Sequence, residues 1–257
     1  MRHKLFRYGW IPDLPDVRDR LFRAPRHIGP KAKPLPKSAD LRSGCPAIYD
    51  QGELGSCTAN AIAAAVEFDQ RKQKIAQPFT PSRLFIYYNE RAIGGTIAID
   101  SGAALRDGIK TVAGQGACPE TMWAYVEQKF AERPPAACYK IGKTHPAVNY
   151  SRLPQDLGSM KACLAAGYPF VFGFTVYESF ESDETAHTGV AAMPGVSETA
   201  LGGHAVMAAG YDDASGRFLV RNSWGTEWGM GGYFTIPYAY VTNGDLAADF
   251  WTIRLVK

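Results

Sequence analysis

The stretch that decides the fold runs from position 51 to position 70 and reads Gln51-Gly-Glu-Leu-Gly-Ser-Cys57-Thr-Ala-Asn-Ala-Ile-Ala-Ala-Ala-Val-Glu-Phe-Asp-Gln70. Its two glycines before Cys57 predict a tight turn, and the following run of helix formers without Gly or Pro predicts a helix that starts at Cys57. The alanines predict that this helix packs closely and is buried. We expect Cys57 to face solvent at this helix start. Because a helix start favours an anion, its thiolate should be stabilised.

Four residues elsewhere could complete a catalytic group around this thiol. Gln51 could donate to a developing oxyanion together with a backbone N–H of the helix. His204, in Gly-Gly-His204-Ala-Val, precedes an apolar strand and could accept the thiol proton. Asn222, in Arg-Asn222-Ser-Trp224-Gly, could fix one ring nitrogen of the histidine, and Trp224 could exclude water from the pair. Each of these residues alone is more typical of a structural role, but the ordered set is specific.

In this order and spacing the residues resemble the papain family of cysteine peptidases, from about Leu41 to the end of the chain. The separation of Cys57 and His204 is 204 − 57 = 147 positions, within the roughly 130–150 typical of that family. The resemblance implies that Cys57 is the nucleophile, His204 its acid/base partner, Asn222 the residue that orients the imidazole and Gln51 part of the oxyanion hole. It also implies that Trp224 shields Asn222.

The same resemblance implies a substrate-binding surface and a fold. Asp100-Ser101-Gly102-Ala103 is similar to the strand that pairs with the substrate backbone, and Gly203 belongs to a small pocket wall before the histidine. The fold implied is α+β with two lobes: a helical lobe containing the nucleophile helix, and an antiparallel, barrel-like β lobe, with the active-site cleft between them. Leu54 and Thr58 occupy positions where relatives carry a cysteine and an aromatic residue. The usual disulfide of the helical lobe therefore cannot form, which suits a short, intracellular bacterial-type member.

Local patterns independently predict a helical first half and a β-rich second half, which is typical of an α+β fold with two lobes. We place the peptidase domain at 38–257, with the helical lobe at about 38–150 and the β-rich lobe at about 151–257. The long stretch 178–203 is expected to be a functional loop. Further helices are predicted over Pro81–Ile93 with Thr80 as cap, Ala103–Ala113 and Leu157–Ala166. Strands are predicted over Phe170–Tyr177, Ala205–Tyr211, Arg217–Asn222, Gly232–Ile236 and Phe250–Val256.

Residues 1–37 form a basic, proline-rich arm. They hold six of the 17 prolines and ten Lys or Arg against three Asp, a balance of +7, so the remainder carries 3 − 7 = −4. Such a segment is extended. We expect it to cover the substrate cleft as an intramolecular partner that keeps the protein a zymogen; a disordered tail or a structural strap is the alternative. Since no nucleic-acid motif accompanies the charge, no nucleic-acid partner is expected.

Composition excludes several other classes of protein. Of the 257 residues, 46% are hydrophobic and 21% charged, which rules out a fully disordered chain. No apolar run is long enough for a membrane span or a secretory signal. Five cysteines without a CxxC pair and five histidines without zinc spacing indicate no metal site, and no cofactor is expected. We therefore expect a cytoplasmic protein with reduced thiols, and signal-less export stays open.

The function predicted is a cysteine endopeptidase that hydrolyses peptide bonds in peptide or protein substrates through an acyl-enzyme thioester. Two alternatives stay open at this point. One is a catalytically silent binding protein on the same fold, whose arm and 178–203 loop would be the working surface. The other is a thiol acyltransferase.

Overall fold

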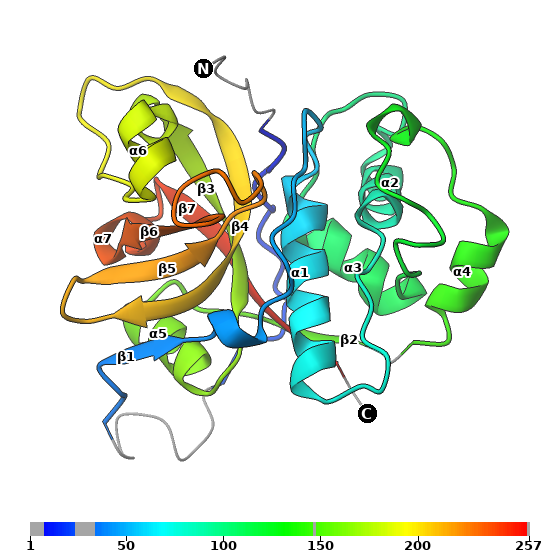
Figure 1. Cartoon of the computed structure of the whole chain (residues 1–257), viewed down its shortest axis with the longest axis horizontal. Coiled ribbons are helices and arrows are strands. Elements are labelled where there is room, and N and C mark those ends of the chain that lie inside the picture. Colours follow the sequence, from blue (N-terminus) through cyan, green and yellow to red (C-terminus); the bar gives the residue numbers. More distant parts are fainter. Residues whose placement is uncertain (1–7, 24–33, 146–147, 256–257) are drawn as a thin grey trace.

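The computed structural model describes residues 8–23, 34–145 and 148–255. Figure 1 shows a helical lobe around α1, α2, α3 and α4, a β-rich lobe beside it, and the N-terminal segment between the two. The helices and 3-10 turns are α1 (Cys57–Lys72), α2 (Arg83–Gly94), α3 (Leu105–Gln115), α4 (Ala136–Gly142), α5 (Leu157–Ala165), α6 (Asp183–Thr188), α7 (Tyr238–Thr242), η1 (Arg42–Gly44), η2 (Glu127–Lys129) and η3 (Glu178–Glu181). The strands are β1 (Ser38–Asp40), β2 (Val148–Arg152), β3 (Phe170–Tyr177), β4 (Ala200–Asp212), β5 (Arg217–Arg221), β6 (Tyr233–Pro237) and β7 (Ala247–Leu255).

Helix α1 is the centre of the molecule. It starts at Cys57 as predicted, and its residues are buried from there to Gln70. It contacts α2 and α3 on one side and β4 and β7 on the other. Its alanines belong to the hydrophobic cluster shared with Trp251 and Ile253 of β7, so small side chains let the sheet approach the helix closely.

Helix α2 starts two residues later than predicted, and the cap is Ser82 rather than Thr80. The Ser82 hydroxyl accepts a hydrogen bond from the backbone N–H of Phe85 at 3.1 Å. Pro81 lies outside the helix because it forms an isolated antiparallel bridge with Pro119. The helix therefore starts after Ser82, whose hydroxyl caps it, and not at Pro81.

Helix α3 also differs from its prediction at both ends. It starts at Leu105 because Ala103 is held in an extended bridge with Trp10. It passes through Gly114 and ends at Gln115, followed by Gly116, whose φ of 70° lies in the left-handed region that favours glycine.

The strands form one antiparallel sheet in the order β2-β7-β3-β4-β5-β6, with β1 paired to β4. The barrel-like description is corrected: in the part of the chain that the structure describes, no pairing joins β6 back to β2, so the sheet is open. Strand β1 comes from residues predicted for the helical lobe and still joins this sheet. The expected strand at Ala205 begins earlier, at Ala200, because β3 is long enough to pair with Ala200–Gly203.

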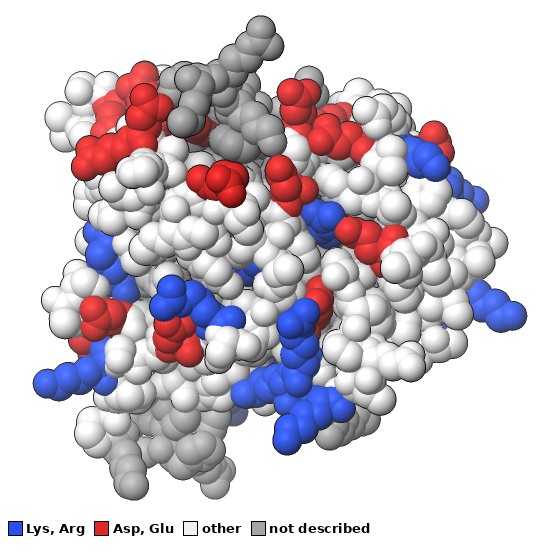
Figure 2. Space-filling view, in the orientation of Figure 1, with Lys and Arg blue, Asp and Glu red and all other residues white. Residues whose placement is uncertain are grey.

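The stretch 178–203 is more structured than a loop. It contains η3, α6 and the first residues of β4. In Figure 2 acidic side chains gather over this part of the face, where η3 and the first turn of α6 carry Glu178, Glu181, Asp183 and Glu184. None of the described helices has the length and hydropathy needed to cross a membrane.

Candidate active site

The thiol of Cys57 lies at the first residue of α1 and is fully buried. Burial raises the pKa of this thiol to about 12, although the backbone N–H groups of Ala205, Gly9 and Thr58 face it and act in the opposite direction. Ala205 follows His204 on β4, so the sheet brings the histidine's own neighbour to the sulfur. The sequence predicted that this thiol faces solvent and has a depressed pKa. That prediction is wrong for this conformation, because the N-terminal segment covers the thiol.

His204 is a residue of β4, and it is also fully buried. Its Nε2 lies 2.8 Å from Oδ1 of Asn222, which directly follows β5. An amide oxygen only accepts, so Nε2 carries the proton. The remaining nitrogen, Nδ1, has no hydrogen-bond partner among the described residues, which leaves it able to accept a proton.

Two further features define the environment of this imidazole. The indole of Trp224 stacks on the ring, with centroids 4.7 Å apart and an interplanar angle of 29°. Burial lowers the pKa of His204 to about 4, and the Asn222 hydrogen bond opposes this. The ring is therefore neutral at pH 7 while the segment stays in place. As predicted, His204, Asn222 and Trp224 lie together.

Gln51 joins the group through the backbone next to Asn222. Its backbone N–H donates to the carbonyl of Ser223 at 2.9 Å, and the Ser223 hydroxyl donates to Gln51 Oε1 at 2.7 Å. Gln51 Nε2 donates to the carbonyl of Leu54 at 2.9 Å. The carboxamide is thus held by residues of both lobes in the turn that leads to Cys57.

The predicted substrate-binding glycines contact the N-terminal segment. Trp10 donates its backbone N–H to the Gly203 carbonyl at 2.9 Å. Gly102 has a φ of 73°, and a β-carbon there would overlap the backbone of Gly9. The side chain of Ser101 bonds Thr96 instead, at 2.8 Å.

Ala103 was predicted both as the last residue of the substrate-binding stretch and as the first residue of a helix. Its N–H donates to the Gly9 carbonyl at 2.8 Å, and its carbonyl accepts from Ile11 at 3.0 Å. The bridge between Trp10 and Ala103 is parallel. Ala103 is thus extended, and the helix predicted to start there begins at Leu105 instead.

The N-terminal segment, residues 8–23, passes between the two lobes (Figure 1). A β-carbon on Gly9 would overlap the backbone of Gly55, so only glycine fits there. The Trp10 side chain is 8% exposed and packs over Gly173 and Gly203. Before them, the Tyr8 hydroxyl donates to Glu181 of η3. Together these contacts remove Cys57 and His204 from solvent.

Comparisons with known proteins identify the family and the fold. Residues 35–249 match the model of the papain family of cysteine proteases. The chain is 42% identical to xylellain, a cysteine protease from Xylella fastidiosa, whose structure superposes with a TM-score of 0.91 over 100% of this chain and 99% of that one. It is also 42% identical to an uncharacterised peptidase C1-like protein of Acanthamoeba polyphaga mimivirus, over 97% of this chain and 87% of that protein. A digestive procathepsin L2 proteinase from the larval midgut of Tenebrio molitor shares the fold, with 21% identity and a TM-score of 0.75, over 98% of this chain and 79% of that chain.

Proposed function

The chain belongs to the papain family of cysteine proteases and is a cysteine-type peptidase; on that premise we propose that it cleaves peptide bonds through Cys57, His204, Asn222 and Gln51. One observation carries the proposal. The N–H of Ala205 faces the Cys57 sulfur while the neighbouring His204 keeps Nδ1 unbonded and Nε2 fixed on Asn222. Because α1 and β4 are in contact, these observations support a thiol and a proton acceptor of defined tautomer that act together.

The steps follow from these groups. His204 Nδ1 accepts the Cys57 proton, and the thiolate attacks the substrate carbonyl carbon to form a tetrahedral intermediate. Gln51 Nε2 and the Cys57 backbone N–H stabilise its oxyanion. The imidazolium then gives its proton to the leaving amine, which leaves a thioester. His204 next takes a proton from water, whose hydroxide releases the acid and restores the thiol.

The test replaces Cys57 by Ala, with Cys45→Ala as the matched control that removes another buried thiol. We expect hydrolysis of a fluorogenic peptide and labelling by a thiol-reactive peptide epoxide to disappear in Cys57→Ala and to persist in Cys45→Ala. Residual turnover near that of the wild type in Cys57→Ala would contradict the assignment. Products formed with added amines separate hydrolysis from acyl transfer.

We further propose that the N-terminal segment is autoinhibitory, as the arm's composition predicted. Gly9 presents its N–H to the Cys57 sulfur, and its carbonyl is bonded to Ala103. The thiol therefore faces an amide N–H rather than a carbonyl carbon, and the segment is not positioned for cleavage there. Burial also acts on both partners, raising the thiol pKa and lowering the imidazole pKa, which disfavours the ion pair.

Deleting residues 1–36 tests autoinhibition. A large gain in initial rate supports it, whereas an unchanged rate with a lower melting temperature indicates a structural strap. Cytoplasmic location stays a prediction from sequence.

A further inference from the structure

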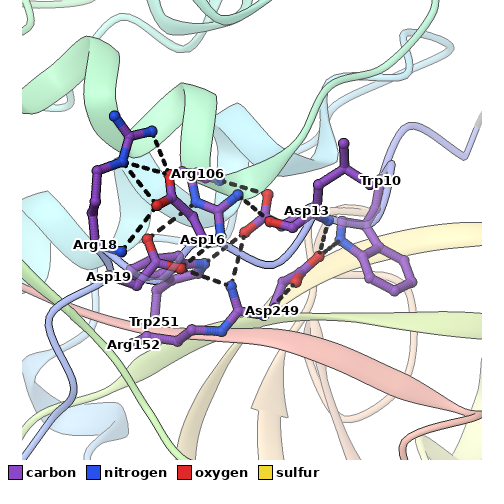
Figure 3. Close-up of polar contacts among 10 residues, drawn as sticks. Trp10, Asp13, Asp16, Arg18, Asp19, Arg106, Arg152, Asp249 and Trp251 are labelled. Carbon is purple, nitrogen blue, oxygen red and sulfur yellow. Dashed lines mark hydrogen bonds and ion pairs between the residues drawn. The ribbon is translucent and has the colours of Figure 1, made fainter.

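Two buried carboxyl groups meet where the N-terminal segment leaves the site. Figure 3 shows Asp13 of the segment beside Asp249 of β7. The backbone N–H of Asp13 donates to Asp249 Oδ2 at 2.7 Å, and Trp10 Nε1 donates to the same oxygen at 3.1 Å. Their side chains are 0% and 1% exposed. The carboxyl pair therefore belongs to the contact that holds Trp10 in place.

Every element around this pair contributes a donor or a charge. Helix α3 supplies Arg106, whose backbone N–H donates to Asp13 Oδ1 at 3.2 Å, and β7 supplies Trp251, whose Nε1 donates to Asp13 Oδ2 at 3.0 Å. Strand β2 supplies Arg152, which pairs with Asp249 at 3.0 Å and lies 3.6 Å from Asp13.

The segment itself adds a third carboxylate. Asp19 pairs with Arg106 at 2.6 Å and with Arg152 at 3.3 Å. Asp16 and Arg18 pair with each other at 2.6 Å and add no net charge. On α3, Asp107 faces both Arg106 and Lys110. We call Asp13, Asp19, Asp249, Arg106 and Arg152 the carboxylate cluster (Figure 3).

The carboxylate cluster has an excess of one negative charge when all of its members are ionised, because three carboxylates face two guanidinium groups. Burying an uncompensated charge is unfavourable, and one bound proton removes it. Burial, and next the charge of Asp249, raise the pKa of Asp13 to about 6 against the opposing effects of Arg106 and Trp251. Burial also raises the pKa of Asp249.

Building on the proposed autoinhibition, we propose that the carboxylate cluster is a proton-operated latch. It binds one proton when the segment lies in the site and loses that proton when the segment leaves. Acid therefore holds the segment in place, and neutral or alkaline solution loosens it. Asp13 and Asp249 are the residues that set this dependence.

The size of the effect follows from linkage. Released into water, Asp13 would titrate near its ordinary value of about 3.9. The bound form therefore holds more protons than the released form between about pH 4 and pH 6, and its relative stability grows as pH falls through that window. With the raised pKa of about 6 for bound Asp13, the binding equilibrium should strengthen about tenfold from pH 8 to pH 5.

A second titrating pair lies under the same segment. Burial lowers the pKa of His204, so protonation of its ring alone would favour release and oppose the latch. Since His204 and Cys57 are the same in all variants of the cluster, their contribution cancels when the variants are compared at equal pH. The informative quantity is therefore the ratio of opening constants between wild type and variant.

Hydrogen exchange on the full-length chain measures this ratio without catalysis. The amides of Trp10 and Ile11 bond Gly203 and Ala103 only while the segment is bound, so their protection reports its opening. The variants are Asp13→Asn and Asp249→Asn, each removing one carboxylate of the pair. The matched control is Asp16→Asn, which removes a charge on the same segment outside the cluster.

We expect the opening constant of wild type, divided by that of Asp13→Asn or Asp249→Asn, to rise about tenfold from pH 5 to pH 8. The ratio to Asp16→Asn should stay constant. A ratio independent of pH for both cluster variants, or one that falls, overturns the latch. Because exchange is read without turnover, such a result leaves autoinhibition intact, whereas failure of the proposed function appears separately in the Cys57→Ala and deletion experiments.

Discussion

Trp10→Ala is the sharpest test of the proposed autoinhibitory contact. The indole is 8% exposed, covers Gly173 and Gly203, and donates to Asp249. Truncating a buried Trp to Ala typically costs about 3–5 kcal/mol. If this loss falls on the bound segment, the binding equilibrium weakens by roughly two to four powers of ten, at about 1.4 kcal/mol per tenfold change.

The assay is the initial rate on a short fluorogenic peptide, with Ile11→Ala as the control. Ile11 is the next residue, makes the same backbone ladder to Ala103, and is 46% exposed. A tethered segment acts at an effective concentration on the order of millimolar, so the wild type is mostly closed and a rise of at least about tenfold in kcat/KM is expected for Trp10→Ala. Ile11→Ala should stay within about twofold of wild type, because an exposed side chain contributes little to burial.

A second readout follows the thiol itself. Alkylation of Cys57 at pH 7 should accelerate in Trp10→Ala, since opening removes the burial that raises the thiol pKa to about 12. If Trp10→Ala instead lowers the melting temperature while leaving both rates at wild-type values, the segment is a strap. That result would refute autoinhibition by the segment.

Three further predictions concern the body of the enzyme. His204→Ala should reduce kcat/KM more than Asn222→Ala, because the imidazole transfers the proton and the amide only orients it; the reverse order would count against these roles. Gln51→Ala should lower kcat by about 10²–10³ with little change in KM, as expected for an oxyanion donor, and a pure KM effect would argue against that role. Burial raises the pKa of Glu90 to about 8, above an unfolded value of about 4.3, so its stabilising protonation is lost as pH rises towards 8. Glu90→Gln should therefore raise the melting temperature relative to wild type more at pH 8 than at pH 5, and an equal shift at both would contradict this.

Local signals were sufficient where neighbouring residues determine the structure. The turn before Cys57 and the alanine-rich run after it specify a buried helix that begins at the thiol. They failed at α2, where Thr80 and Ser82 both carry a hydroxyl suited to capping. Ser82 caps the helix because Pro81 is held outside it by a bridge to Pro119, which local signals do not reveal.

The meeting of His204 with Asn222 depends on the register of β4 and β5, which no single segment determines. That register pairs Met207 with Arg221 and so brings the histidine and the asparagine to the same end of the two strands. Spacing alone did not supply this geometry; the resemblance to a known family did. The helix start predicted at Ala103 failed for the same reason, since the residue that holds Ala103 extended, Trp10, belongs to another segment.

At Cys57, local sequence features predict the wrong direction for the pKa shift of the thiol. A helix start does favour a thiolate, and the backbone N–H groups near Cys57 act in that direction. Burial outweighs them, and the N-terminal segment that covers the thiol lies far from Cys57 in sequence. The depressed pKa predicted from sequence is therefore expected of the released enzyme, and the raised one belongs to the covered form. In the latch proposal, one proton bound by the carboxylate cluster, next to the Trp10 indole nitrogen, sets the populations of the two forms and with them the reactivity of Cys57.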